Sequence, residues 1–289
     1  MLPSVLPTFP LPQDPDMTAK LAIAAIQMVS AASVGPNLET ARRLVRDAAD
    51  GGATLVVLPE FFCLLGRKDT DKVDAKEPAG EGPIQQALAE IAREAGVWLV
   101  GGTVPIASSE PRRIRNACLV LRPDGTTSAR YDKVHLFGLK RDGLRFDESA
   151  TIQPGSTPTV ADLAGPDGAP WRVGLSVCYD LRFPEFYRAL GTVDLIVVPS
   201  AFTYPTGQAH WEVLLRARAI ENQCYVLAPA QGGSHENGRR TWGHTMLIDP
   251  WGEVLACLPE GEGVVAGTLS AERIAEVRAQ LPALAHRTM

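Results

Sequence analysis

Short runs of β-branched and aliphatic residues alternate along the chain with amphipathic stretches of helical period. Runs of this kind, bounded by glycine, proline or charged residues, are typical of strands that are covered on both faces. They predict buried strands over residues 21–29, 54–58, 97–106, 171–177, 194–198 and 224–230. The first of them, LAIAAIQMV, contains no charged residue.

The amphipathic stretches predict helices, and their ends carry the expected stop signals. In residues 36–50, for example, Leu38, Leu44 and Val45 fall on one face, and Gly51 follows the last helical residue. Further helices are predicted over residues 83–95, 183–190, 210–223 and 271–281, the last with a surface or subunit-contact role. The charged segment 66–82 is predicted as a solvated loop.

Two hairpins interrupt this alternation. Strands 114–121 and 126–131 are joined through Pro123-Asp124-Gly125, and the hairpin 244–258 turns at Asp249-Pro250-Trp251-Gly252; such residues favour tight turns. After the first hairpin, a Gly- and Arg-rich loop extends to about residue 155, and a strand follows at 158–162.

Each half of the chain therefore follows the order β-α-β-α-β and then a hairpin. Alternating strands and helices predict parallel pairing, and the hairpins add antiparallel edges. Two such halves combine best as two stacked mixed sheets with helices on their outer faces. We expect an α/β protein with a four-layer α-β-β-α sandwich, formed by residues 17–289 as one domain.

Composition limits the functional classes. The 289 residues are 45% hydrophobic and 21% charged with a formal net charge of −5, which is typical of a globular protein and gives no reason to expect nucleic acid as a partner. No apolar run reaches membrane-spanning length, so no membrane partner is expected. Residues 1–16 have five prolines and no lysine or arginine, which indicates a disordered tail rather than a signal peptide; Met17 is an alternative start.

The five cysteines show neither a disulfide framework nor a CxxC spacing, which favours a reducing compartment, the cytoplasm. The five histidines show no HxH or HExxH spacing, so we expect no metal ligand and no cofactor. Cys224 lies within a strand pattern and is interpreted as a core residue.

Three polar residues follow predicted strands closely. Glu60 and Cys178 come at the carboxyl ends of buried strands, where ligands gather in α/β sheets, and Lys133 follows a hairpin strand. Cys178 also precedes a predicted helix with Pro184 in its first turn, so we expect the helix dipole to favour its thiolate. A lone cysteine after a strand is otherwise most often a core residue.

The motifs LPEFF around Glu60, YDKVHLF around Lys133 and SVCYDLRFPE around Cys178 occur in this order. Together they resemble the carbon–nitrogen hydrolase (nitrilase) superfamily, and the likeness runs from about residue 21 to the C-terminus. The segments VPSAFTYPTGQAHWEVLLRARAIENQCYVLAPAQ and GHTMLIDPWGEV are similar to Nit-type amidases. The resemblance implies hydrolysis of a small carboxylate-bearing amide, deaminated glutathione or a 2-oxo acid amide, to acid and ammonia through a thioester.

Physical chemistry assigns roles to these residues. Glu60 accepts the thiol proton and returns it to the leaving nitrogen, Cys178 attacks, and Lys133 donates to the oxyanion together with the backbone N–H of Tyr179. The cation also lowers the pKa values of Glu60 and Cys178. The resemblance further implies a positioning glutamate, for which we choose Glu148 in RFDES; Asp142 and Asp147 are nearby competitors.

Four residues are candidates for substrate binding. Arg182 is placed to grip a substrate carboxylate, although it could instead pair with Asp180 or Glu185. Phe202 and Thr206, in the loop after strand 194–198, are candidate pocket walls, and His210 either caps its helix or contacts substrate.

Other functions remain open at this stage. The same triad would serve a nitrilase or an N-carbamoyl amide hydrolase, and a non-catalytic binding or scaffold protein is a third class. Self-association, as a homodimer or a larger homo-oligomer, is expected from the family, through the face that bears helix 210–223 and the C-terminal segment.

Overall fold

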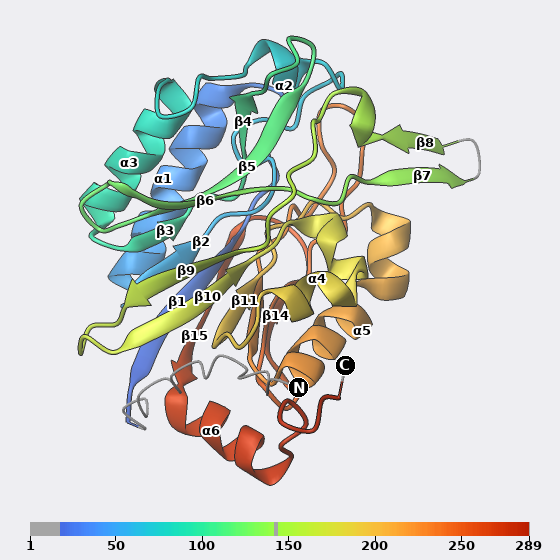
Figure 1. The fold of residues 1–289 in the computed structure, drawn as a ribbon. Coiled ribbons are helices and arrows are strands. Elements are labelled where there is room, and N and C mark those ends of the chain that lie inside the picture. The colour runs from blue at the N-terminus through green and yellow to red at the C-terminus, as the bar shows by residue number, and fades with distance from the viewer. Residues whose placement is uncertain (1–17, 142–143, 289) are drawn as a thin grey trace, which may run out of the picture.

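The computed structural model describes residues 18–141 and 144–288, and most of its strands form two sheets that pack face to face (Figure 1). The first sheet consists of β1 (Lys20–Gln27), β2 (Leu55–Val57), β3 (Trp98–Val100), β4 (Val104–Ala107), β5 (Ile114–Leu121), β6 (Thr127–Asp132) and β15 (Gly263–Ser270). Its order is β15-β1-β2-β3-β5-β4, and β6 also pairs with β5. Strands β1, β2 and β3 are parallel, whereas β15 and β5 flank them antiparallel.

The second sheet repeats this plan. It consists of β9 (Thr159–Ala164), β10 (Pro170–Leu175), β11 (Leu195–Val197), β12 (Tyr225–Ala228), β13 (Thr245–Ile248) and β14 (Val254–Leu258), in the order β14-β13-β12-β11-β10-β9. Strands β10, β11 and β12 are parallel, and their neighbours β9 and β13 are antiparallel to them.

Helices cover the outer faces of the two sheets (Figure 1). Helices α1 (Val34–Asp50) and α3 (Pro83–Ala95) lie on the first sheet, and α4 (Pro184–Ala189) and α5 (Tyr204–Asn222) lie on the second. The remaining elements are α2 (Asp71–Asp74), α6 (Ala271–Gln280), the hairpin β7 (Gly138–Arg141) and β8 (Leu144–Asp147), and two 3₁₀ turns, Glu148–Ala150 and Cys178–Arg182. The predicted four-layer α-β-β-α sandwich is confirmed.

Strand β1 shows why its sequence is apolar throughout. Side chains alternate across a strand, so Leu21 and Ile23 join the core that contains the second sheet, whereas Ala24 and Ile26 join the core beneath α1 and α3. A strand in the interior of this sandwich therefore has no solvent-exposed face.

Several predicted element boundaries were wrong. Residues 97–106 form two strands rather than one, because the chain turns at Gly102, which has φ +54°. The loop predicted before residue 155 contains the β7–β8 hairpin, and the loop predicted at 66–82 contains α2. Strand β15 was not predicted. Helix α5 begins at Tyr204 rather than at residue 210, with Pro205 in its first turn.

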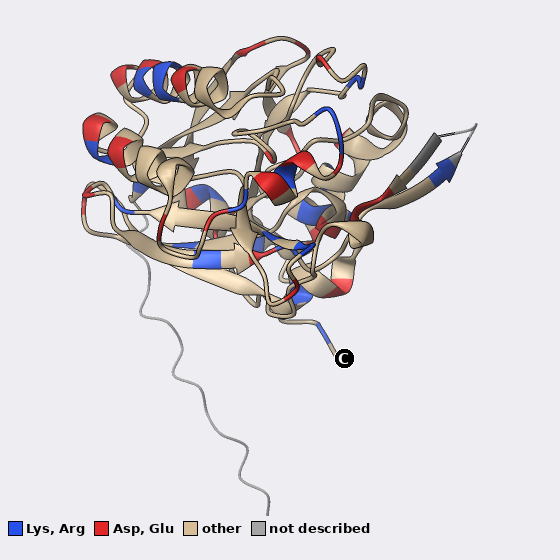
Figure 2. Cartoon of the chain, turned by 90° about the horizontal axis from the view of Figure 1, so that it is seen from above, with Lys and Arg blue, Asp and Glu red and all other residues tan. Residues whose placement is uncertain are grey.

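Lys and Arg are interspersed among Asp and Glu along the chain, as the coloured cartoon of Figure 2 shows. No helix in the described part of the chain is long and apolar enough to span a membrane. The disordered tail predicted for residues 1–16 lies outside the described residues.

Candidate active site

Glu60 follows β2 and is 1% exposed. Its Oε1 accepts hydrogen bonds from Asn116 Nδ2 at 3.0 Å and Lys133 Nζ at 2.8 Å, and its Oε2 accepts from the backbone N–H of Ala201 at 3.1 Å. The next residue, Phe61, adopts a left-handed backbone with φ +56°, a conformation that L-residues seldom adopt outside functional or tightly held turns. The Glu60 carboxylate is thus fixed by donors from three distant segments.

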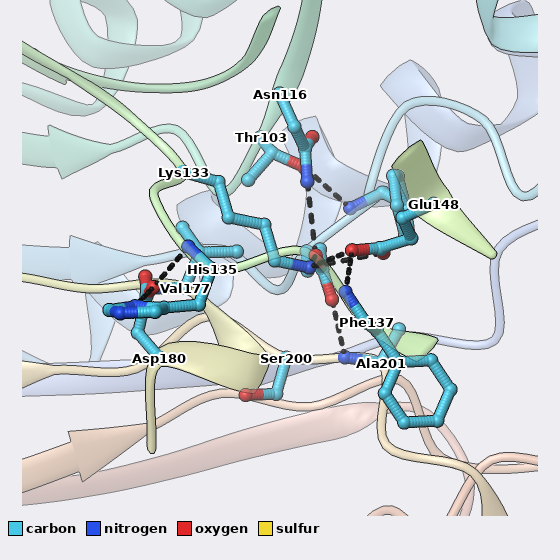
Figure 3. A network of polar contacts seen from close by, with 12 residues as sticks. Thr103, Asn116, Lys133, His135, Phe137, Glu148, Val177, Asp180, Ser200 and Ala201 are labelled. Atoms are coloured by element: carbon cyan, nitrogen blue, oxygen red, sulfur yellow. Dashed lines mark hydrogen bonds and ion pairs between the residues drawn. The ribbon is translucent and has the colours of Figure 1, made fainter. Parts of the chain in front are cut away.

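Lys133 lies just beyond β6, and its side chain is fully buried. Its ammonium lies 2.8 Å from Glu60 Oε1 and 2.8 Å from Glu148 Oε2. Figure 3 shows Lys133 reaching toward Glu148, with Asn116, Phe137 and Ala201 around them. A buried lysine is stable only when it is paired, and here two carboxylates pair with it.

Glu148 opens the 3₁₀ turn after β8. Besides its bond to Lys133, its Oε2 accepts from the Phe137 N–H at 2.7 Å, while the Glu148 N–H donates to the Phe137 carbonyl at 3.0 Å. Of its two competitors, Asp147 accepts from the N–H of Ser149 and caps this turn, and Asp142 lies outside the described residues. Glu148 is therefore the glutamate that the β7–β8 hairpin brings to Lys133.

Cys178 follows β10 and is 7% exposed. It begins the 3₁₀ turn in a left-handed conformation, φ +49°, and its N–H donates to the Pro199 carbonyl at 3.0 Å. The expectation that it faces the start of an α-helix was wrong, because α4 begins only at Pro184. The rest of the 3₁₀ turn that Cys178 begins, and Phe183, lie between the thiol and that helix.

Burial dominates the electrostatics of the thiol. It raises the pKa of Cys178 well above its ordinary value, and the charge of Glu60 raises it further, whereas Lys133 opposes the rise. The thiolate expected from a helix dipole is therefore disfavoured in the free enzyme; the dipole contributes about 2 kcal/mol at most and the helix is not at the thiol. The thiol needs a base.

Glu60 is suited to be this base, because its pKa is raised. Its burial raises its pKa, Lys133 lowers it, Glu148 raises it again, and the net shift is upward. Lys133 thus lowers the pKa values of both Glu60 and Cys178, as expected, but burial raises them by more. For Lys133, burial alone would lower the pKa, but Glu148 and Glu60 outweigh burial and raise it well above the ordinary value, so the ammonium stays charged.

Asp180 fixes the turn that carries Cys178. This fully buried carboxylate accepts hydrogen bonds from Tyr131 Oη at 2.6 Å, from the Val177 N–H at 2.8 Å and from the N–H and Nδ1 of His135 at 3.0 and 2.8 Å. Figure 3 shows Asp180 beside Val177 and His135. Because Tyr131 and His135 flank Lys133 in the chain, Asp180 ties the lysine segment to the cysteine turn.

Arg182 is not used to hold this turn. Within the described residues it pairs with neither Asp180 nor Glu185; its guanidinium instead lies 3.3 Å from His210 Nδ1 and packs over the rings of Tyr179 and Phe202. The alternative pairing considered for Arg182 was therefore wrong.

The remaining predicted pocket residues are placed by the early start of α5. Thr206 lies in the first turn of α5 rather than in a loop, and His210 lies further along α5, so His210 does not cap the helix. Phe202 and Thr206 line a space of about 20 Å³ beside Cys178 and Arg182. His210 lines neither this space nor the larger cavity described next, although it contacts Arg182.

A larger cavity of about 300 Å³ also reaches Cys178. Glu60 and Glu148 line it, together with the aromatic rings of Phe61, Phe137 and Phe146. Charged side chains also line it: Lys72 from α2, Asp69 from the segment just before α2, and Arg239 and Arg240 from the loop before β13.

Several contacts of this site carry no signal in the sequence. The N–H groups of Phe137 and Ala201 are backbone donors, which every non-proline residue has. Asn116 lies in β5, and the only feature of IRNACLVL that could have indicated it is a polar residue within an apolar run.

All five cysteines are free, and the described residues contain no cluster of three or more His, Cys, Asp or Glu side chains arranged to hold a metal ion.

The four-layer sandwich and the buried Glu60–Lys133–Glu148 group beside Cys178 together indicate a hydrolase with a cysteine at its site. Comparison with known proteins agrees with this class. The carbon–nitrogen hydrolase family model matches residues 22–279. The chain is 40% identical over 269 residues to the deaminated glutathione amidase of Yersinia enterocolitica, covering 91% of this chain and 92% of that protein. It is 36% identical over 270 residues to omega-amidase NIT2 of Xenopus tropicalis, covering 91% and 94%.

A solved structure shows the same fold. Nit3 of Saccharomyces cerevisiae, a member of the nitrilase superfamily, matches with a TM-score of 0.82 at 28% identity, over 96% of this chain and 100% of that one. This chain belongs to the carbon–nitrogen hydrolase family. It is a hydrolase that acts on the carbon–nitrogen bond of amides.

Proposed function

We propose that this protein is a cysteine amidase in which Cys178 is the nucleophile and Glu60 the proton carrier. The observation that supports this most directly is the fully buried Lys133 held between Glu60 and Glu148 at the thiol. A structural role alone would not explain the burial of three charges beside a cavity, because buried ion pairs bring little net stability.

The reaction begins with proton transfer. Cys178 is neutral in the free enzyme, and Glu60, whose raised pKa makes it a stronger base, takes the thiol proton as Sγ attacks the amide carbonyl carbon. The C–N bond then breaks as Glu60 returns that proton to the nitrogen, which leaves as a neutral amine, and a thioester remains. Water attacks the thioester with Glu60 again as base, and the acid and the free thiol are released.

Lys133 and a backbone N–H stabilise the negative charge on the carbonyl oxygen. An ammonium has three N–H donors: one bonds Glu60, a second is shared between the two oxygens of Glu148 at 3.0 and 2.8 Å, and the third is left for the oxyanion. The N–H of Tyr179, the residue after the nucleophile, is the second donor that we propose. Such donors typically contribute on the order of 3–4 kcal/mol each to the transition state. Glu148 is a positioning residue in this scheme, because it holds Lys133.

The names of the relatives indicate the substrate class. They act on deaminated glutathione or on omega-amides, in which a 2-oxo acid is linked to nitrogen through a second carboxyl group. Arg182, free of acidic partners within the described residues, would bind the 2-oxo acid carboxylate, with Phe202 and Thr206 beside it. A primary amide releases ammonia, whereas deaminated glutathione releases cysteinylglycine.

Mutation of the nucleophile tests this proposal. Cys178→Ala should lower the release of 2-oxoglutarate from 2-oxoglutaramate and from deaminated glutathione by more than about 10³-fold, because no thioester can form. Cys224→Ala is the matched control, since this buried thiol lies outside both spaces at the site. Undiminished turnover by Cys178→Ala would show that the reaction does not use this thiol.

The assembly and location of the protein are further parts of the proposal. Residues 17–289 act as one catalytic domain, and self-association as a homodimer or larger oligomer uses the α5 face, where Val213, Ile220, Trp251 and Leu255 are exposed. Light scattering measures that size. The five free thiols favour a reducing location, the cytoplasm.

A further inference from the structure

Two spaces meet at the Cys178 thiol. The larger, about 300 Å³, is lined by both Glu60 and Glu148, whereas the smaller, about 20 Å³, is lined by Arg182 and by neither glutamate. Phe137 and Cys178 line both. A substrate whose carbonyl carbon lies at the thiol therefore extends toward both spaces.

The position of Glu60 decides which end of the substrate points where, provided that the proposed function holds. The leaving nitrogen must lie within hydrogen-bond reach of the carboxyl group that protonates it, and Glu60 lines the larger cavity but not the smaller space. The amine portion of the amide accordingly occupies the larger cavity. The acyl portion points toward Arg182.

Three cations line the larger cavity, and two of them already have partners. Arg239 Nη2 lies 2.7 Å from Asp69 Oδ1, and Arg240 Nη2 lies 3.2 Å from Glu260 Oε1. Lys72, by contrast, makes no ion pair or hydrogen bond with any other residue that the structure describes; its ammonium lies 5.2 Å from the centre of the Phe61 ring.

The surroundings of Lys72 favour an anionic ligand. The residue is half-buried, and its burial lowers its pKa, since an ammonium removed from water is unstable without a partner. The nearest acidic charges, Glu148 and Asp69, already bind Lys133 and Arg239. An arriving carboxylate would supply the charge that Lys72 lacks, and the rings of Phe61 and Phe146 would cover the apolar part between that carboxylate and the amide.

We propose that Lys72, flanked by Arg239, binds a carboxylate on the leaving amine. Among the substrates already proposed, those whose leaving amine is an amino acid or short peptide with a free carboxyl group, such as deaminated glutathione, are then preferred. A primary amide, which releases only ammonia, leaves this part of the cavity unused.

Three substrates with one acyl group test the proposal: deaminated glutathione, its C-terminal carboxamide, and 2-oxoglutaramate. The wild-type protein should cleave the free-carboxylate compound with a kcat/KM about 10- to 100-fold above that for the carboxamide, which is the range for one charge-assisted hydrogen bond. Lys72→Met should remove this difference, because kcat/KM for the free-carboxylate compound should fall by far more than kcat/KM for 2-oxoglutaramate. Lys72→Arg should keep most of it.

Lys68→Met is the matched control, because Lys68 precedes α2, is exposed and does not line the cavity. Turnover of 2-oxoglutaramate reports on folding within the same preparation. Equal wild-type kcat/KM for the carboxylate and the carboxamide, or an equal loss on all three substrates in Lys72→Met, would overturn the proposal. In either case Cys178-dependent cleavage would persist, so the proposed function would stand.

Discussion

At the scale of single residues, the site depends on one cation shared by two carboxylates. Lys133 pairs with both Glu60 and Glu148, so one positive charge is shared between two negative charges. The surplus charge, with burial, raises the pKa of Glu60. Glu148 therefore does more than hold Lys133 in place, because it also makes Glu60 a stronger base.

This coupling predicts a pH effect. Glu60 must be unprotonated to accept the thiol proton, so kcat/KM is lost as pH falls through its pKa, and this loss comes above the ordinary glutamate value of 4.5. Glu148→Gln removes a charge that raises this pKa and leaves Lys133 to Glu60 alone. The acidic limb of the kcat/KM profile should therefore move to lower pH, and kcat/KM at its plateau should fall about 10- to 100-fold because Lys133 loses a charged partner.

The control for this profile is Glu185→Gln, which removes an exposed charge from α4 and should leave both the limb and the plateau in place. If the acidic limb of the Glu148→Gln profile stayed at the wild-type pH or moved to higher pH, the charge of Glu148 would not act on Glu60.

At the scale of elements, the turns after the strands place the reacting groups. The left-handed residues Phe61 and Cys178 adjoin or form the site, and Gly102 forms the turn between β3 and β4. A Cβ atom at Gly102 would lie 2.1 Å from the carbonyl oxygen of Pro59, the residue before Glu60. The backbone of one turn thus packs directly against the backbone that carries the base.

Gly102→Ala should disturb both stability and catalysis. The left-handed backbone, φ +54°, costs an alanine about 1–2 kcal/mol, and the clash with Pro59 displaces Glu60, so kcat should fall as well. Gly96→Ala provides a matched control: it has φ +64° but nothing within 4 Å of the added Cβ, so it should lose about the same 1–2 kcal/mol and keep its kcat. Urea unfolding and steady-state kinetics measure the two effects. Equal kcat for the two variants would contradict the role given to this turn.

The elements also show what the sequence could reveal. Aliphatic runs identified the parallel strands of both sheets, because strands without a solvent-exposed face need apolar residues at nearly every position. They did not reveal β15, in which buried residues such as Leu269 are interspersed with half-buried and exposed ones, or β7 and β8, which form a separate two-stranded sheet. The break at Gly102 was missed because the apolar run continues through it.

The residues of the candidate site also fall into those that the sequence could predict and those that it could not. Glu60, Lys133 and Cys178 lie at the ends of strands within recognisable motifs, so the sequence could predict them. Lys72 could not be predicted, because its role depends on which nearby carboxylates already have partners. The pKa of Cys178 was also misjudged, since burial of the thiol exceeds the effect of a helix that begins six residues later.

At the scale of the whole molecule, the site exists only when both halves of the sandwich are together. Glu60 follows the first sheet, whereas Cys178 and Ala201 belong to the second half, and Ala201 donates to Glu60 across the junction. Gln231, which follows β12, forms a second link: its Nε2 donates to the Glu60 carbonyl at 3.1 Å and to Ser30 Oγ at 2.7 Å, and its Oε1 accepts from the Ser30 N–H at 3.0 Å.

Gln231→Leu removes this link without changing the size of the side chain greatly. Gln231 is fully buried, so the Ser30 N–H and the Glu60 carbonyl would lose their partners inside the protein, and each such group typically costs about 1–3 kcal/mol. We expect the free energy of unfolding to fall by roughly 2–4 kcal/mol and kcat to fall as Glu60 shifts. Gln86→Leu, on the exposed face of α3, should change the stability by less than about 0.5 kcal/mol. Urea denaturation measures the difference; a Gln231→Leu protein as stable and as active as Gln86→Leu would show that the packing of the sheets, without this hydrogen-bonded link, suffices to hold the two halves of the site in register.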